Sequence, residues 1–383
     1  MTDGKRSSRR DHESRILREL RRAGTLGRAD LVRRTSLPRS SVFAIVGELI
    51  SSGVLIESTE AGSTERRRGR PSALISLDPA TGLIVGVDIG RQSVRMVVAN
   101  SAHQIVAAGA ADPPAGPQTA DSCAEVAEAL IRRVADAEGI DLSALDAIGV
   151  GLFGLPGVHD SVASQSDALC HRLSSRFEVP VLSGNNSRLA ALAEATWGAG
   201  RNVDDQVYVR WSVGVGGGYL VAGRPLLGAH GAAGELGHVS IDPDGPACEC
   251  GGRGCLERSI GGQALIEQCR RRGLRVADLN ALVDAVQARM AVAEDVVTGA
   301  ASQLGVVVAG TVAQLDPQRV ILGGELGQLG GPVVDAVQAE IDRLAVPKLR
   351  RTVEVVRADL GVNDGALGAV ALVLRSRQLS STG

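Results

Sequence analysis

The sequence predicts an α/β protein in which a large body follows a small, basic, mostly helical head. Strand-like apolar runs that end in glycine turns recur after residue 82 and alternate with amphipathic stretches, a pattern typical of α/β folds. The charge is also divided, because residues 1–72 hold 16 Lys and Arg against 9 Asp and Glu although the whole chain has a formal net charge of −2. At 383 residues the chain is long enough for two or three domains.

The composition excludes several classes of protein. Hydrophobic residues make up 44% of the chain and charged residues 22%, as in globular proteins. The longest apolar stretches are interrupted by Gly, Thr and Gln, so no membrane span is expected, and the polar N-terminus predicts no secretory signal. Of the six cysteines, three cluster near residue 250 and three are scattered. This spacing argues against a disulfide framework and favours a reducing cytoplasm.

The head shows the pattern of a helix-turn-helix. Three short helices are predicted, at residues 11–24, 27–35 and 39–53. In the last helix, apolar side chains at helical spacing face a core and leave Arg39, Ser40 and Ser41 on the outer face near its start. The start of a recognition helix is the part that enters the major groove.

Two apolar runs, at residues 53–57 and 72–77, predict a hairpin next to these helices. The polar loop between them carries four arginines placed to contact phosphates or a minor groove, namely Arg66, Arg67, Arg68 and Arg70. A basic hairpin beside a helix-turn-helix is a wing and predicts operator DNA as a partner. The alternative is a three-helix packing module with an exposed charged loop.

The body begins with an apolar strand at residues 82–90 that ends in Asp-Ile-Gly. Further elements are expected as strands at residues 94–100, 147–157 and 319–323, a helix at 121–137, and two strands around a glycine-rich turn at 207–226. The glycines of that turn are Gly214, Gly216, Gly217 and Gly218. Three glycine turns and an Asp at a strand end favour an ancestral nucleotide cleft between two lobes.

Asn185 and Asn186 stand where a predicted strand opens into a helix. Free backbone N–H groups converge at such a junction, which makes it a common ligand position in α/β proteins. Both amides can hold a polar ligand, but neither can accept a proton at neutral pH. The residues alone leave three uses open: an active site without its base, a binding pocket, or helix capping.

The most specific local pattern is a group of metal-binding side chains in segment 234–257. Three Cys and one His in a glycine-rich loop meet the needs of a closed tetrahedral zinc site, namely His238, Cys248, Cys250 and Cys255. Four protein ligands leave no position for water, so the predicted role is structural. Buried free thiols and a redox pair are the alternatives, although a redox pair usually reads Cys-x-x-Cys and the close pair here is Cys-x-Cys.

Over nearly its whole length the chain resembles the ROK group of bacterial repressors and sugar kinases. The resemblance rests on the segments GAAGELGHVSI and CECGGRGCLE, the glycine-rich SVGVGGGYLVAGRPLLGAHGAAG, and the junction RRRGRPSALISLDPATGLIVGVDIG. It implies a winged helix-turn-helix followed by a two-lobed, actin-like sugar-kinase body with a structural zinc loop. It also implies a pocket for a sugar that is lined by Asn185, Asn186, Glu235, His238 and Glu257.

The chain departs from the kinases of that group at the residues of the reaction. The kinases carry Asn-Asp where this chain has Asn185-Asn186, and that Asp is their catalytic base, which an amide cannot replace. The first phosphate turn reads DIGRQ, with Arg91 and Gln92 in place of Gly and Thr, which disfavours ATP binding. The segment after the Pro-Gly at 156–157 also looks shorter than the family's pocket loop. We therefore expect no enzyme activity and neither ATP nor Mg²⁺ as a cofactor.

The sequence thus predicts a cytoplasmic DNA-binding regulator, most simply a repressor, whose body senses a sugar or another small ligand. The predicted domains are the winged helix-turn-helix at 1–78, a first lobe at 79–182 and a zinc-containing second lobe at 183–383, with a return of the C-terminal segment to the first lobe left open. A homodimer or homotetramer is expected because helix-turn-helix operators are palindromic. Two alternatives are an ATP-dependent sugar kinase and a regulator controlled by a protein partner.

Overall fold

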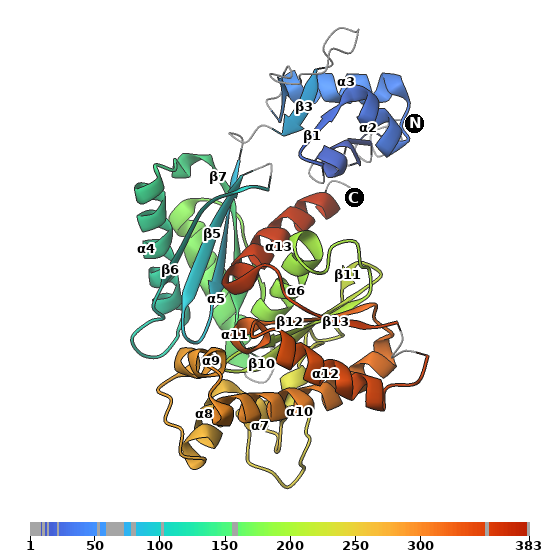
Figure 1. Cartoon of the computed structure of the whole chain (residues 1–383). Coiled ribbons are helices and arrows are strands. Elements are labelled where there is room, and N and C mark those ends of the chain that lie inside the picture. The colour runs from blue at the N-terminus through green and yellow to red at the C-terminus, as the bar shows by residue number, and fades with distance from the viewer. Residues whose placement is uncertain are drawn as a thin grey trace.

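The fold consists of a small head above a two-lobed body (Figure 1). The computed structural model describes residues 9, 12–13, 15–20, 23–51, 54–58, 73–77, 82–100, 103–154, 160–348 and 352–380. The predicted α/β class of the body is confirmed, because it contains two mixed five-stranded sheets with helices packed on them.

The head combines helices with a three-stranded antiparallel sheet of order β1-β3-β2. Its elements are α2 (Arg28–Thr35), α3 (Arg39–Ser51), β1 (Thr25–Gly27), β2 (Leu55–Ser58) and β3 (Leu74–Leu77). Ser36 ends α2 in the left-handed conformation, with a φ of 55°. The predicted helices at 27–35 and 39–53 and the hairpin strands are confirmed where the structure describes them, whereas the predicted helix at 11–24 is described only in part. Strand β1 is a difference, because the predicted helices left residues 25–26 as a link, whereas residues 25–27 pair with β3.

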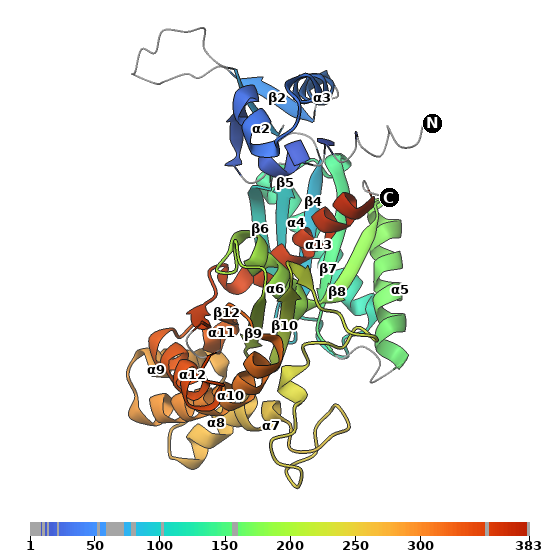
Figure 2. The same ribbon diagram turned by 90° about the vertical axis from the view of Figure 1, so that its right-hand side faces the viewer.

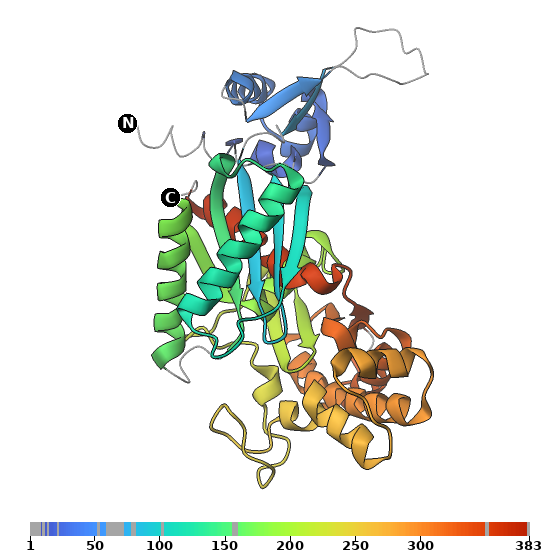
Figure 3. The same cartoon turned by 90° about the vertical axis from the view of Figure 1, so that its left-hand side faces the viewer.

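The first lobe is built on a sheet of order β6-β5-β4-β7-β8, in which β4, β7 and β8 run parallel. Its strands are β4 (Leu83–Ile89), β5 (Val94–Asn100), β6 (Ile105–Ala111), β7 (Leu145–Leu152) and β8 (Val181–Asn185). Helices α4 (Ala120–Glu138) and α5 (Asp160–Phe177) lie on one face, and the C-terminal helix α13 (Asp364–Ser380) lies on the other (Figure 3). Covered on both faces, β4 is an almost unbroken apolar run.

The second lobe is built on a sheet of order β11-β10-β9-β12-β13. Its strands are β9 (Gln206–Trp211), β10 (Val215–Val221), β11 (Arg224–Pro225), β12 (Arg319–Gly323) and β13 (Glu354–Arg357). Helix α6 (Asn186–Trp197) packs on β9 and β10, on the side toward the first lobe. The remaining helices gather at the far end of the body in Figure 2, namely α7 (Leu256–Ile260), α8 (Gly262–Arg271), α9 (Leu279–Gln287), α10 (Ala291–Leu315), α11 (Gly324–Gly327) and α12 (Gly331–Leu344).

Helix α10 is long and apolar enough to cross a membrane by length and composition alone. Half of its most apolar window is buried inside the second lobe. It packs there against α7, α8, α9 and α12, which is the environment of a core helix.

The glycine-rich segment of the second lobe corrects one prediction. Gly216, Gly217 and Gly218 do not form a turn but lie inside strand β10, and the turn before them ends at Gly214. A Cβ at Gly218 would lie 2.6 Å from the Cβ of Ala191, and a Cβ at Gly217 would lie 2.7 Å from a backbone oxygen. These glycines therefore allow α6 and the loop before Glu235 to pack closely on the strand.

Helices α6 and α13 lie between the two sheets and pack against each other. The backbones approach so closely at two glycines of this region that a side chain would not fit there. A Cβ at Gly368 of α13 would lie 1.9 Å from the Leu189 carbonyl oxygen of α6, and a Cβ at Gly149 of β7 would lie 2.1 Å from the Ala369 carbonyl oxygen. These two glycines thus allow the C-terminal helix to pack directly against the backbones of α6 and β7.

We expect Gly149→Ala to lower the free energy of unfolding by about 2–3 kcal/mol, because the added methyl group collides with backbone that cannot rotate away. Gly299→Ala is the matched control, since no atom lies within 4 Å of its added Cβ on α10. The control should stabilise the protein by about 0.5–1 kcal/mol through helix propensity. Urea unfolding measures both changes, and a Gly149→Ala variant as stable as the wild type would contradict the seating of α13.

Candidate functional site

A cavity of about 420 Å³ opens between the two lobes. It lies at the carboxyl ends of β4, β7, β8 and β9, the edge at which α/β sheets hold ligands. The structure brings all five predicted pocket residues to its wall, namely Asn185, Asn186, Glu235, His238 and Glu257. Their roles toward a ligand stay a prediction. The segment predicted to be shortened begins at the Pro-Gly, and residues 155–159 of it lie outside the described residues.

Asn185 ends β8 and caps helix α6. Its Oδ1 accepts hydrogen bonds from the backbone N–H groups of Ser187 at 3.0 Å and Arg188 at 3.1 Å. Its Nδ2 donates to the carbonyl oxygen of Gly154 at 3.2 Å. Helix capping is therefore one real use of this amide. Any bond from Asn185 to a ligand has to come from the remaining N–H of the same side chain.

Asn186 is the first residue of α6 and is 8% exposed. Its Nδ2 donates a hydrogen bond to Oδ1 of Asp88, near the end of β4, at 3.2 Å. This amide, which the resemblance places at the position of the kinase base, is thus bound to the aspartate of the first turn. The carboxamide itself cannot take a proton.

Arg210 on β9 joins two carboxylates that sequence reasoning did not connect. Its Nη2 lies 2.9 Å from Oδ2 of Asp88 and 3.5 Å from Oδ1 of Asp364, at the start of α13. The hydroxyl group of Tyr208 also donates to Asp364. Asp88 is 2% exposed and Asp364 is 1% exposed. Because Asp88 belongs to the first sheet and Arg210 to the second, this network ties the lobes together across the floor of the cavity.

The network pairs one buried cation with two buried carboxylates. Burial alone would lower the pKa of Arg210, but the charges of Asp364 and Asp88 raise it well above its ordinary value. Burial also raises the pKa of Asp364, and Arg210 opposes that rise. The sequence signal for this network is an arginine inside the apolar strand VYVRW, since a buried arginine is almost always paired.

Two glutamates line the second-lobe side of the cavity. Glu257, at the start of α7, accepts a hydrogen bond from the backbone N–H of Val215 at 2.7 Å. Burial raises the pKa of Glu235 to about 7, with Arg188 opposing the rise and Glu257 adding to it. Arg188, which sequence reasoning also missed, donates to the carbonyl oxygens of Gly231 and Ala233. The loop that carries Glu235 is thereby held against α6.

Arg91 links the first turn of the first lobe to the cysteine loop of the second. Both terminal nitrogens of Arg91 lie 3.3 Å from a carboxylate oxygen of Glu249. The guanidinium carbon lies 5.2 Å from the ring centroid of Phe153. Arg91 and Glu249 both line the cavity, so this exposed pair crosses the cleft between the lobes. Arg91 therefore makes a solvent-exposed contact between the two lobes.

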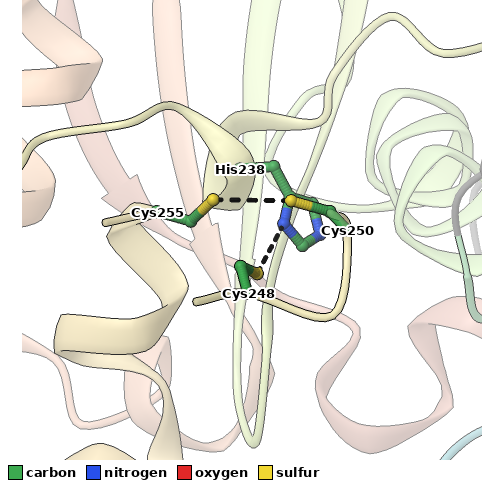
Figure 4. A group of neighbouring side chains, drawn as sticks. All are labelled: His238, Cys248, Cys250 and Cys255. Carbon is green, nitrogen blue, oxygen red and sulfur yellow. Dashed lines mark hydrogen bonds between the residues drawn. The ribbon is translucent and has the colours of Figure 1, made fainter. Parts of the chain in front are cut away.

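The four predicted metal ligands converge in space (Figure 4). One donor atom from each of His238, Cys248, Cys250 and Cys255 lies within 4.8 Å of the others. The Cys250 and Cys255 sulfurs are 3.5 Å apart, as are the Cys248 sulfur and Nδ1 of His238. A tetrahedron with Zn–S bonds of about 2.3 Å has sulfur–sulfur edges of about 3.8 Å. The donor set and its spacing therefore fit a tetrahedral metal ion.

The structure describes three of the seven residues that are predicted to contact DNA. On α3, Arg39 and Ser40 are exposed and Ser41 is half-buried. The four wing arginines, Arg66, Arg67, Arg68 and Arg70, lie outside the described residues.

The fold and the cavity define a two-lobed α/β body with a ligand-sized cleft, a cysteine loop at its rim that could hold a metal ion, and a small N-terminal head. The ROK family model matches residues 84–376, and the chain belongs to this family. The resemblance drawn from the sequence is thereby confirmed.

Proteins similar to this chain include both regulators and kinases. The DNA-binding transcriptional dual regulator NagC of Escherichia coli K12 is 28% identical over 94% of this chain and 91% of its own length. A ROK family transcriptional regulator, a homologue of the E. coli MLC protein, has a TM-score of 0.78 at 22% identity over 98% of this chain and 99% of its own. A Streptomyces griseus ROK glucokinase, solved with glucose and AMPPNP, has a TM-score of 0.67 at 26% identity over 76% of this chain and 99% of its own. The sugar-kinase-like body is thus confirmed.

We expect Glu235→Gln to stabilise the protein at pH 8 and to leave its stability unchanged at pH 4. Glu235 has a pKa of about 7 in the folded chain, above its ordinary value of 4.5. Ionised Glu235 therefore destabilises the folded state above pH 7, and this penalty fades as the pH falls toward 4.5. Allowing for solvent screening, the gain is about 1–2 kcal/mol. Melting curves at the two pH values measure it, and an equal gain at both would show that Glu235 titrates normally.

Proposed function

We propose that this chain is a cytoplasmic transcriptional regulator, most simply a repressor, that binds operator DNA through α3 and senses a sugar or another small ligand through its body. The observation that carries the proposal is the exposed start of α3, where Arg39 and Ser40 face solvent beside a three-stranded sheet. That arrangement is the one a winged helix-turn-helix presents to a major groove. The similarity to NagC along 94% of the chain supports it.

The cavity supports the sensing part of the proposal. Its volume of about 420 Å³ falls in the range of about 300–1,000 Å³ that is typical of small-molecule sites. Amides and carboxylates on its wall provide both donors and acceptors for hydroxyl groups. A ligand that contacts both lobes changes the angle between them and hence the spacing of two heads in a homodimer or homotetramer on a palindromic operator.

DNA binding by full-length protein should weaken steeply with salt, because phosphate contacts release counterions. We expect Arg39→Ala to weaken binding to a selected duplex by about tenfold or more, the usual cost of a base-reading arginine. Arg289→Ala is the matched control: that side chain is 79% exposed in the second lobe and pairs with Glu294. Fluorescence anisotropy measures both variants. If the protein retained no DNA at low salt, the proposed function as a DNA-binding regulator would be refuted.

The cavity also supports the absence of phosphoryl transfer. Asn186 and Arg210 engage both carboxylate oxygens of Asp88, and the Arg210 guanidinium supplies positive charge where Asp88 and Asp364 converge. A divalent cation would have to displace this internal cation. Loss of catalysis therefore depends on Arg210 as well as on the missing base.

We expect Asn186→Asp to remain without sugar kinase activity, because the Arg210 guanidinium beside Asp88 also attracts the new carboxylate and weakens it as a proton acceptor. Incubation with ATP, Mg²⁺ and a panel of hexoses and N-acetylhexosamines, followed by measurement of ADP, checks this. The wild type run in parallel defines the background. Turnover by Asn186→Asp at least tenfold above the wild type would instead show that the missing base alone disables the site.

We further propose that the metal held by His238, Cys248, Cys250 and Cys255 is zinc with a structural role, because four protein ligands leave no open position. Elemental analysis should find about one equivalent per chain. Cys250→Ser should release the metal and lower the melting temperature of the body, since structural zinc contributes to folding. Cys170→Ser, a half-buried cysteine outside the group, should keep it. A stable, metal-free wild type would contradict the assignment.

A further inference from the structure

The outer face of α3 carries a large apolar side chain among basic residues. Phe43 is 40% exposed and follows Arg39 by one helical turn. The guanidinium carbon of Arg39 lies 5.1 Å from the centroid of the Phe43 ring, and that of Arg28, at the start of α2, lies 5.7 Å away. Arg28 is in turn bound to Glu57 of β2, with one N–O distance of 3.2 Å. Phe43 is thus held in place by two cations while its ring remains open to solvent.

The neighbours of Phe43 on this face are small. Helical periodicity groups six positions on one side of α3, namely Arg39, Ser40, Phe43, Ala44, Gly47 and Ser51. Gly47 is half-buried and the other five are exposed, whereas Val42, Ile45, Val46 and Leu49 face the core. Small side chains around one ring and one guanidinium allow a partner surface to approach the helix backbone closely. This face therefore presents two protruding groups, one cationic and one apolar.

The major groove of DNA offers a partner for each of these groups. An arginine binds O6 and N7 of guanine, and the apolar group on a base edge there is the 5-methyl of thymine. Residues 39 and 43 are about 6 Å apart along a helix that rises 1.5 Å per residue, and stacked bases are about 3.4 Å apart. We propose that Phe43 contacts the 5-methyl group of a thymine that lies within two base pairs of a guanine read by Arg39. The inference rests on the proposed function.

The two flanking arginines make this contact specific to Phe43. Held by Arg28 and Arg39, the ring loses little conformational freedom when DNA binds. Arg28 is also neutralised by Glu57, so it positions Phe43 and does not act as a free phosphate-binding cation. Phe43 is then a specificity-determining residue, because the adenine, guanine and cytosine edges carry no methyl group.

The test uses the full chain and a duplex selected by it from a random-sequence library. Each thymine is replaced in turn by uracil, which removes only the 5-methyl group. We expect one thymine per half-site at which this change weakens wild-type binding about fourfold, the value of one buried methyl group. Phe43→Ala should bind the thymine and uracil duplexes equally. In the same duplex, each guanine is replaced in turn by 7-deazaguanine. We expect one guanine at which this change weakens DNA binding by the wild type but not by Arg39→Ala, and this guanine should lie within two base pairs of the thymine.

Ile56→Ala is the matched control, because Ile56 is 39% exposed on β2 of the same head and lies off the α3 face. It should retain the fourfold preference for thymine, and both variants should melt at the wild-type temperature. The contact is overturned if no thymine shows a uracil penalty, if Phe43→Ala keeps the penalty, or if the Arg39-dependent guanine lies farther away. If the protein retained no duplex at low salt, both the proposed regulator function and the proposed contact between Phe43 and thymine would be overturned.

Discussion

The arrangement of the two lobes depends on the Arg210 guanidinium held between Asp88 and Asp364. Burying two carboxylates and one arginine is costly unless the geometry of the pairs and their hydrogen bonds compensates for desolvation. Here Asn186 and Tyr208 complete the bonding of the two carboxylates. A change in lobe angle has to stretch or replace these bonds. The network therefore sets the resting shape of the cleft, and a ligand acts on the head only if it contributes more binding energy in another shape.

The same cluster places a fixed positive charge in a sugar-kinase-like body. In phosphoryl transfer, metal ions bridge the phosphate oxygens and neutralise their charge. Arg210 instead pairs with Asp88 and Asp364 at the floor of the cavity. The Arg91–Glu249 pair likewise joins the first turn to the cysteine loop. Groups suited to contact phosphates thus make contacts between the two lobes.

Much of the fold and part of the site follow from local sequence. Several strands and helices, the cysteine loop and the start of α3 were predictable because periodicity, ligand spacing and turn residues act over short distances. The Arg210 network was not, because Asp88, Arg210 and Asp364 are far apart in sequence and meet only when the two sheets pack. The role of Gly216, Gly217 and Gly218 was misread for the same reason: glycines that allow a close helix contact look like glycines of a turn. No motif marks Phe43 in the sequence, and only its exposure in the fold reveals it.

The seating of α13 has a consequence for synthesis. The first sheet is complete once residue 185 has left the ribosome, but the helix that covers one of its faces begins at residue 364. At about 5–20 residues per second, that apolar face waits roughly 10–40 s for its cover. During this interval α6 also lacks its partner. The nascent chain therefore carries an exposed hydrophobic surface until residues 364–380 have been synthesised, and this late segment covers the first sheet.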